Sequence, residues 1–141
     1  MAKLTLLPVL FWFVAALAAA DDAGRVVFDY QMNCQGCHTP DGAGAGSVPA
    51  LKGHVGVFLQ SQAGREYLVR VPGSATSALS DERLAAVLNW IIYEFAGNSL
   101  QLPFTPYTAA EVAPLRKNPL NEVDDYRQHV LRAIAGADAR E

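Results

Sequence analysis

The chain has few of the residue types from which disulfide scaffolds, nucleic-acid surfaces and common catalytic sites are built. Its 141 residues include only two cysteines, which excludes a disulfide-rich scaffold. Basic side chains are outnumbered, 11 against 14 acidic ones, and they are scattered along the chain. Phosphate binding needs clustered Lys and Arg, so we expect no nucleic-acid partner. No Ser/His/Asp arrangement, phosphate-binding loop or carboxylate pair is visible, and we therefore do not expect an enzyme.

Apolar residues, by contrast, make up 51% of the chain and are concentrated at the N-terminus. A single lysine, Lys3, precedes an apolar run over residues 4–17, and small residues follow at 18–20. This is the order of parts in a secretory signal peptide, and the run is shorter than the ~20 residues that span a bilayer. We predict a signal peptide over residues 1–20 and a periplasmic folded part. The alternative is an uncleaved anchor over residues 4–20, and only then do we expect attachment to a membrane.

Both cysteines, Cys34 and Cys37, directly precede His38 in the motif CQGCH. One interpretation is covalent attachment of a haem through two thioethers, with the histidine as axial iron ligand. A second is a dithiol redox pair, which we would expect in a strand–helix setting. A third is half of a zinc site, but only His54 and His129 remain as further ligands of this kind, and they are far apart in sequence. The export signal and the absence of other cysteines favour one covalently bound haem c.

The residues around this motif resemble the haem-binding stretch of bacterial monohaem class I cytochromes c. That family commonly has an aromatic residue four positions before the first cysteine, an asparagine directly before it and a glycine-rich loop after the histidine. Tyr30, Asn33 and the loop that follows His38 match these features. The segment VPALKG over residues 48–53 is similar to the family's Pro-x-Leu-x-Gly segment. The resemblance implies that the Pro49 carbonyl accepts the Nδ1 hydrogen of the histidine.

The resemblance extends over about residues 23–97 and implies an all-α, cytochrome c-like haem domain over residues 21–97. An apolar stripe at helical spacing predicts its last helix, with Ser80 as N-cap and Gly97 as stop. The stripe consists of Leu84, Val87, Leu88, Ile91, Ile92 and Phe95. Earlier in the domain, we predict a helix over residues 23–33 that buries Val27, Phe28 and Tyr30. Residues 67–71 have the apolar character of an extended run.

Residues 98–141 form a C-terminal extension beyond the minimal family form. Several prolines punctuate its first part, and the sequence TAAE over residues 108–111 is a capping box that predicts a short helix. Residues 121–134 are predicted to form a second helix, because apolar residues recur on one face. We expect a strap and a helix packed on the haem domain, with a frayed polar tail over residues 136–141.

The sixth iron ligand is missing from its usual place. Class I cytochromes usually supply a methionine from the loop before the C-terminal helix, but here that loop, residues 71–78, contains none. Met1 is lost with a signal peptide, and Met32 lies on the proximal side, two residues before the first cysteine. His54, or His129 on the extension, is therefore a candidate sixth ligand. The alternatives are an iron that is five-coordinate or water-bound, and a lysine, tyrosine or partner-supplied ligand.

Two arginines, Arg65 and Arg70, are candidates for holding a haem propionate. A guanidinium matches a carboxylate with two parallel hydrogen bonds, although a solvated surface arginine is the commoner outcome.

The function implied by the resemblance is one-electron transfer in the periplasm. The redox partners would be a substrate-oxidising dehydrogenase and an acceptor such as a terminal oxidase chain. Two other functions stay open. A five-coordinate haem could bind or sense a small diatomic ligand, and the extension could dock the protein to a larger oxidoreductase as a haem subunit.

Overall fold

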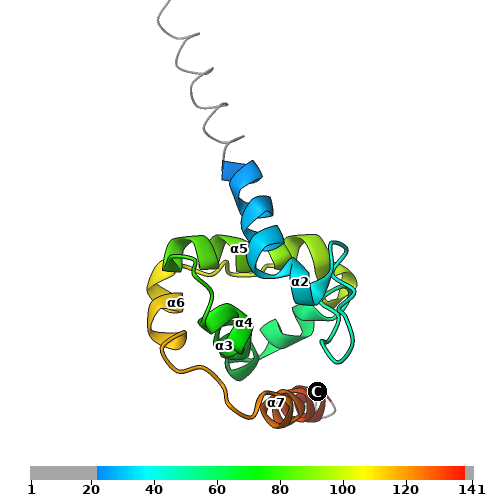
Figure 1. Cartoon of the computed structure of the whole chain (residues 1–141). Helices are drawn as coiled ribbons and strands as arrows, with labels where there is room; N and C mark the ends of the chain where they lie inside the picture. Colours follow the sequence, from blue (N-terminus) through cyan, green and yellow to red (C-terminus); the bar gives the residue numbers. More distant parts are fainter. Residues whose placement is uncertain (1–21, 139–141) are drawn as a thin grey trace, which may run out of the picture.

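The computed structural model describes residues 22–138, and these residues form helices joined by turns and loops (Figure 1). In chain order the elements are a helix over residues 22–33, α2 (Gln35–His38), η1 (Val55–Gln60), α3 (Gln62–Arg70), α4 (Pro72–Ala75), α5 (Asp81–Phe95), η2 (Gly97–Ser99), α6 (Ala109–Leu115) and α7 (Val123–Asp138), where η marks a 3-10 helix. No strand occurs in this part of the chain, which confirms the all-α prediction. The predicted signal peptide lies outside the described residues. Within residues 22–138, no helix has the length and apolar character that crossing a bilayer requires.

The long helix α5 carries the apolar stripe predicted from the sequence. Ser80 accepts a hydrogen bond from the Arg83 backbone N–H at 3.3 Å, which satisfies one of the free N–H groups at the start of the helix. Gly97, with a φ of 52°, follows the helix in the left-handed conformation that glycine adopts without steric cost. All six residues of the stripe are buried. Burying one such side chain stabilises the fold by roughly 1.5–3 kcal/mol, so the stripe decides which face of α5 meets the core.

The helix over residues 22–33 packs against α5 through an aromatic cluster. The ring centroid of Tyr30 lies 4.9 Å from that of Trp90 and 5.5 Å from that of Phe95. The Tyr30 hydroxyl also donates a hydrogen bond to the Thr39 carbonyl at 2.6 Å. This ring therefore ties the helix contact to the loop that follows α2, and its predicted burial is confirmed.

An ion pair between Asp29 and Arg83 also favours one orientation of this helix about its own axis. The Asp29 carboxylate is buried and accepts hydrogen bonds from Arg83 of α5, at 2.8 Å from Nε and also from Nη2. A buried carboxylate is stable only when it is paired, so this contact favours one orientation of the helix. Phe28 then points outward and is 56% exposed, which makes the prediction of its burial wrong.

Most of residues 67–71 belong to α3, so the prediction of an extended run is wrong. Ser61 accepts a hydrogen bond from the Gly64 N–H at 3.0 Å and caps the helix. Gly64, Tyr67 and Leu68, at the spacing i, i+3 and i+4, are buried, and so is Val69. η1, α4, α6 and α7 all contact α3. A helix covered on several sides carries apolar residues at consecutive positions, and over five residues this pattern is the same as that of a buried strand.

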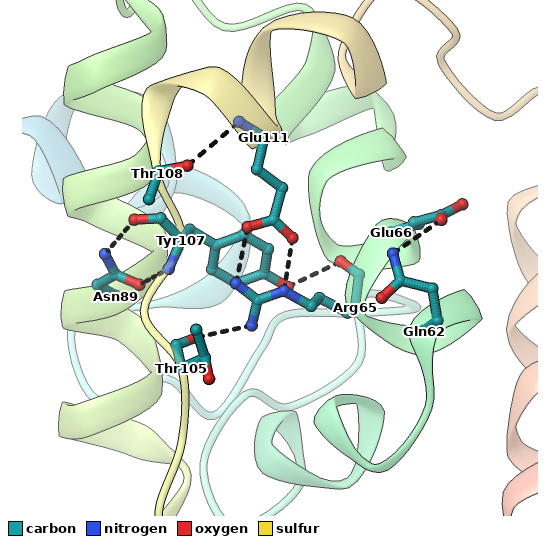
Figure 2. A network of polar contacts seen from close by, with 8 residues as sticks. All are labelled: Gln62, Arg65, Glu66, Asn89, Thr105, Tyr107, Thr108 and Glu111. Carbon is teal, nitrogen blue, oxygen red and sulfur yellow. Dashed lines mark hydrogen bonds and ion pairs between the residues drawn. The ribbon is translucent and has the colours of Figure 1, made fainter.

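A polar network joins the extension to α3 and α5 (Figure 2). Thr108 accepts a hydrogen bond from the Glu111 N–H at 3.2 Å, which confirms the predicted start of α6. The Glu111 carboxylate accepts two hydrogen bonds from the Arg65 guanidinium, at 2.5 and 2.8 Å, and this guanidinium lies 4.0 Å above the ring of Tyr107. Asn89 of α5 exchanges two hydrogen bonds with the backbone of Tyr107. The network thus fixes the strap before α6 against both helices.

At the end of α6, Arg116 holds the segment that leads into α5. Its guanidinium donates hydrogen bonds to the carbonyls of Ala75, Ser77 and Leu79 at 2.6 to 3.2 Å, and to the Asp81 carboxylate at 3.1 Å. This segment belongs to the loop in which the family usually has its methionine. Here the extension ties the backbone of that loop in place.

The last helix, α7, packs on α3 and η1, and in Figure 1 it lies at the opposite end of the molecule from residues 22–33. Val130 and Ile134 are buried, and the ring of Tyr126 stacks on that of Tyr67 with the centroids 6.2 Å apart. The helix continues to Asp138 and so extends into the predicted tail.

Three buried tyrosines make the folded state sensitive to alkaline pH. Burial raises the pKa of Tyr30 from 10.0 to about 12, with smaller contributions from Cys34 and Asp41. Burial also raises the pKa of Tyr67 and of Tyr107. These hydroxyls hold their proton more tightly in the folded state, so their contribution to stability is complete below about pH 10 and is lost as the pH rises toward 12. We expect the free energy of unfolding to fall above pH 10, by at most about 1.4 kcal/mol per pH unit for each ring.

Denaturant unfolding of the haem-loaded protein between about pH 9 and pH 12 measures this loss. The variant Tyr30→Phe should show a shallower decline, because it lacks one of the hydroxyl protons that the folded state holds more tightly. Tyr93→Phe is the matched control: its ring is 62% exposed, so the decline should match that of the parent protein. Equal declines in the parent protein and in Tyr30→Phe would contradict the prediction.

Candidate functional site

A cavity of about 320 Å³ lies among the helices, within the size range of cofactor sites. Its walls come from the end of the helix over residues 22–33, from α2, η1, α3, α4, α5 and α7, and from the loop over residues 47–51. Most of the lining side chains are apolar, including Val55, Phe58, Leu68, Leu88, Ile91 and Ile92. Such walls exclude water and suit a large hydrophobic ligand.

The structure brings the three residues of the CQGCH motif together at this cavity. The Cys34 N–H donates a hydrogen bond to the Tyr30 carbonyl at 2.8 Å, and the His38 N–H donates one to the Cys34 carbonyl at 3.0 Å. This single helical turn places Cys34, Cys37 and His38 in the cavity wall. Cys34 is half-buried, Cys37 is exposed, and neither forms a disulfide. The predicted grouping is therefore present, while the chemical roles of these residues stay predictions.

The thiol of Cys34 is held in its protonated form. Burial raises its pKa to about 11, and the charges of Asp29 and Cys37 add to the shift. A zinc ligand or a redox-active cysteine works as a thiolate, which a raised pKa disfavours. Within the described residues, no three His, Cys, Asp or Glu side chains are grouped to hold a metal ion, and the strand of a strand–helix redox motif is missing. The zinc and dithiol interpretations therefore lack their structural setting.

A sharp turn directly after α2 fixes the position of His38. Its carbonyl accepts hydrogen bonds from the Gly44 N–H at 3.1 Å and from the Thr39 hydroxyl at 2.5 Å. Thr39 has a φ of 62°, in the left-handed region that few residues other than glycine occupy. Its carbonyl in turn accepts the Tyr30 hydroxyl, so the turn is anchored in the core. The chain leaves α2 abruptly, and His38 stays at the cavity wall.

The ring of His38 presents a buried nitrogen that needs an acceptor. Its Nδ1 makes no hydrogen bond of standard geometry with any of the described residues. Burial lowers the pKa of His38, and the nearby carbonyl of Pro49 opposes part of that shift. The imidazole is therefore neutral at pH 7, the form that binds a metal ion. Pro49 lines the same cavity, so the acceptor that the family resemblance implies is close to the ring.

Neither candidate histidine for the sixth iron position lines the cavity. His54 is exposed in the turn before η1, where its Nδ1 pairs with the Lys52 carbonyl at 2.8 Å. His129 is exposed on α7, on a different face from the buried Val130 and Ile134. A ligand must come within bonding distance of the metal, so the structure does not support His54 or His129 as the sixth ligand.

The two arginines predicted to hold a propionate are engaged elsewhere. Arg65 binds Glu111, as Figure 2 shows. Arg70 donates from Nε to the Asn118 carbonyl at 2.9 Å, and its guanidinium lies 5.5 Å from the ring centroid of Tyr126. Neither arginine lines the cavity, and that expectation is not supported.

Sequence reasoning missed two polar residues that do line the cavity, Tyr67 of α3 and Arg127 of α7. A signal for Arg127 was present. It lies four residues after Val123, so helical spacing places both side chains on one face of α7. Tyr67 was missed because residues 67–71 were predicted to be extended, and its position on one face of a helix was therefore not considered.

Comparison with known proteins agrees with the site. The family model for cytochrome c matches residues 22–92. Two relatives, each a cytochrome c-552 from Thermus thermophilus, resemble the chain. One is 36% identical over 129 aligned residues, which cover 78% of this chain and 85% of the relative. The other is 37% identical over 106 residues, covering 62% of this chain and 81% of the relative. No solved structure matches the chain significantly. The matched family model and the extent of these alignments show that the chain belongs to the cytochrome c family.

Proposed function

We propose that this protein is a periplasmic electron carrier between a substrate-oxidising dehydrogenase and an acceptor such as a terminal oxidase chain. Membership of the cytochrome c family makes it an electron-transfer haem protein with covalently bound haem c. The observation that carries the proposal is the apolar cavity on which Cys34, Cys37 and His38 converge. The export signal predicted over residues 1–20 supports the compartment.

The residues of the cavity fit a haem c. Covalent attachment needs two cysteines on one face, the iron needs a neutral imidazole, and the porphyrin needs apolar walls. The wall contains Cys34 and Cys37, burial keeps His38 neutral, and most of the other lining residues are apolar. The buried Nδ1 of His38 is free to donate a hydrogen bond to the nearby Pro49 carbonyl, and this bond would orient the ring toward the iron.

Each residue of the motif then has a role. Cys34 and Cys37 would each add their S–H across one vinyl group, forming one C–S and one C–H bond without net oxidation or reduction. His38 would ligate the iron through Nε2, and the Pro49 carbonyl would hold the ring through Nδ1. When bound, the haem supplies the one-electron couple of its iron.

The surroundings of the motif would tune electron transfer. Apolar walls disfavour the additional positive charge of ferric iron and so raise the reduction potential. Cys37 is exposed, which brings this attachment point to the surface, where a redox partner can approach. A raised reduction potential and an accessible attachment point both suit an electron carrier.

One observation favours a second candidate function, the binding of a small diatomic ligand. Among the described residues, the cavity lining contains no methionine, no lysine and no histidine besides His38. Class I cytochromes usually close the sixth iron position with methionine, so the lining is consistent with an open or water-bound position.

Optical spectra of the purified holoprotein test both functions. A c-type pyridine haemochrome, reversible one-electron reduction and slow or absent carbon monoxide binding would support the carrier. Fast carbon monoxide binding to the ferrous protein would favour the ligand-binding function. The variants His54→Ala and His129→Ala should leave the spectra unchanged, because neither residue lines the cavity. A haemochrome without the c-type signature would overturn both functions. N-terminal sequencing of protein from the periplasmic fraction tests cleavage of the signal peptide.

A further inference from the structure

Among the described residues, Arg127 is the one permanently charged side chain that lines the cavity. It extends from α7, is half-buried, and its guanidinium lies 5.7 Å from the ring centroid of Phe58. Arg65, Arg83 and Arg116 each form an ion pair with a carboxylate, whereas Arg127 forms none with the described residues. Arg127 is thus a half-buried cation at an apolar cavity that forms no ion pair with the described residues, so an anion bound in the cavity can pair with it.

Tyr67 adds a polar group on the same wall. Tyr67 and Arg127 both line the cavity, and both contact Phe58, whose ring stacks on that of Tyr67 and lies below the Arg127 guanidinium. The Tyr67 ring is held between Phe58 and Tyr126, with centroid distances of 4.8 and 6.2 Å. Its hydroxyl makes no hydrogen bond to the described residues that would use the donor. Together the guanidinium and the hydroxyl form a site for a carboxylate.

We propose that Arg127 pairs with a haem propionate, with the Tyr67 hydroxyl as a second donor, so that the C-terminal extension completes the haem site. The haem brings two carboxylates into the cavity that holds the unpaired cation, and a guanidinium can give a carboxylate two parallel hydrogen bonds. This inference rests on the proposed attachment of the haem by Cys34 and Cys37.

The pairing changes two measurable properties of the haem. It stabilises the ionised propionate, so the pKa of that carboxyl is lowered. The positive charge of Arg127 also disfavours ferric iron and raises the reduction potential. Other titratable groups near the pair are Tyr67 and His38 in the cavity wall and Asp124, whose charge acts on Tyr67.

The experiment uses holoprotein whose haem carboxyl carbons are labelled with ¹³C, and NMR follows their titration. In Arg127→Gln one carboxyl should become a weaker acid by about tenfold or more, which is at least one pKa unit, and the midpoint potential should fall. Arg127→Lys should retain part of both properties, and Tyr67→Phe should show a smaller change in the same direction. Arg132→Gln is the matched control, because Arg132 is exposed on the same helix. Both properties should stay as in the parent protein.

Three results separate the outcomes. An unchanged carboxyl titration in both Arg127→Gln and Arg127→Lys would overturn the inference. So would an unchanged titration together with an altered affinity of the ferric protein for azide, because Arg127 would then face a ligand on the iron. Failure of the proposed function is distinct from either, since the haemochrome of the parent protein would already lack the c-type signature.

Discussion

Replacing Cys34 and Cys37 together by serine is expected to abolish covalent haem attachment. Serine preserves the size of each side chain, but its hydroxyl does not form a thioether. The cavity would also lose the ligand that fills it. At ~24 cal/mol per Å³, an empty cavity of about 320 Å³ costs roughly 8 kcal/mol, which is comparable with the whole stability of a small domain. The double variant should therefore lose cooperative unfolding as well as haem.

Haem staining after denaturing electrophoresis measures the attachment, and circular dichroism follows the unfolding. Met32→Ala is the control, because Met32 lies two residues before the first cysteine but is 66% exposed. It should retain both the covalent haem and a cooperative transition. Covalent haem in the double serine variant would show that the motif is not the attachment site.

The second large effect is expected from Gly64→Ala in α3. A Cβ atom at this position would lie 2.1 Å from the Phe58 carbonyl oxygen and 2.8 Å from its carbonyl carbon. Both are backbone atoms of η1, which cannot rotate away as a flexible side chain can. We expect a loss of more than about 3 kcal/mol in the free energy of unfolding. Because Phe58 lines the cavity, the haem absorption band should also shift.

Gly136→Ala provides the comparison within another helix. No atom lies within 4 Å of a Cβ at this position of α7, so alanine should stabilise the protein by roughly 0.5–1 kcal/mol through its helix propensity. Denaturant midpoints of the two variants should move in opposite directions. A Gly64→Ala protein as stable as its parent would mean that η1 and α3 are not packed this closely.

Features that depend on neighbouring residues could be predicted from the sequence. Ser80 and Thr108 cap the helices that their spacing indicated, and the stripe of α5 is buried as its period requires. The CQGCH motif likewise places its side chains on one cavity because one helical turn separates them. In each case the deciding interaction joins residues that are only a few positions apart, so the local sequence is enough to predict it.

Predictions that depended on a distant partner failed. Phe28 is as apolar as a core residue, but it is exposed in the structure. The helix is oriented so that the neighbouring Asp29 pairs with Arg83, which is 54 positions away in the chain. Arg65 carries the charge that a propionate needs, yet Glu111 of the extension binds it. Residues 67–71 form a helix with several neighbours, and these neighbours account for its apolar pattern.

The sequence by itself determined the grouping of the motif, because two cysteines and a histidine within one helical turn need nothing else to share a face. Which other groups line the cavity was decided by the tertiary structure. Tyr67 and Arg127 are 60 positions apart in the chain, and they line one cavity only because α7 docks on α3 and η1. A helical period shows which face of a helix is buried, but not which element covers that face, since this depends on how all the faces pack together. The same packing leaves His54 and His129 outside the cavity and brings Arg127 into its wall.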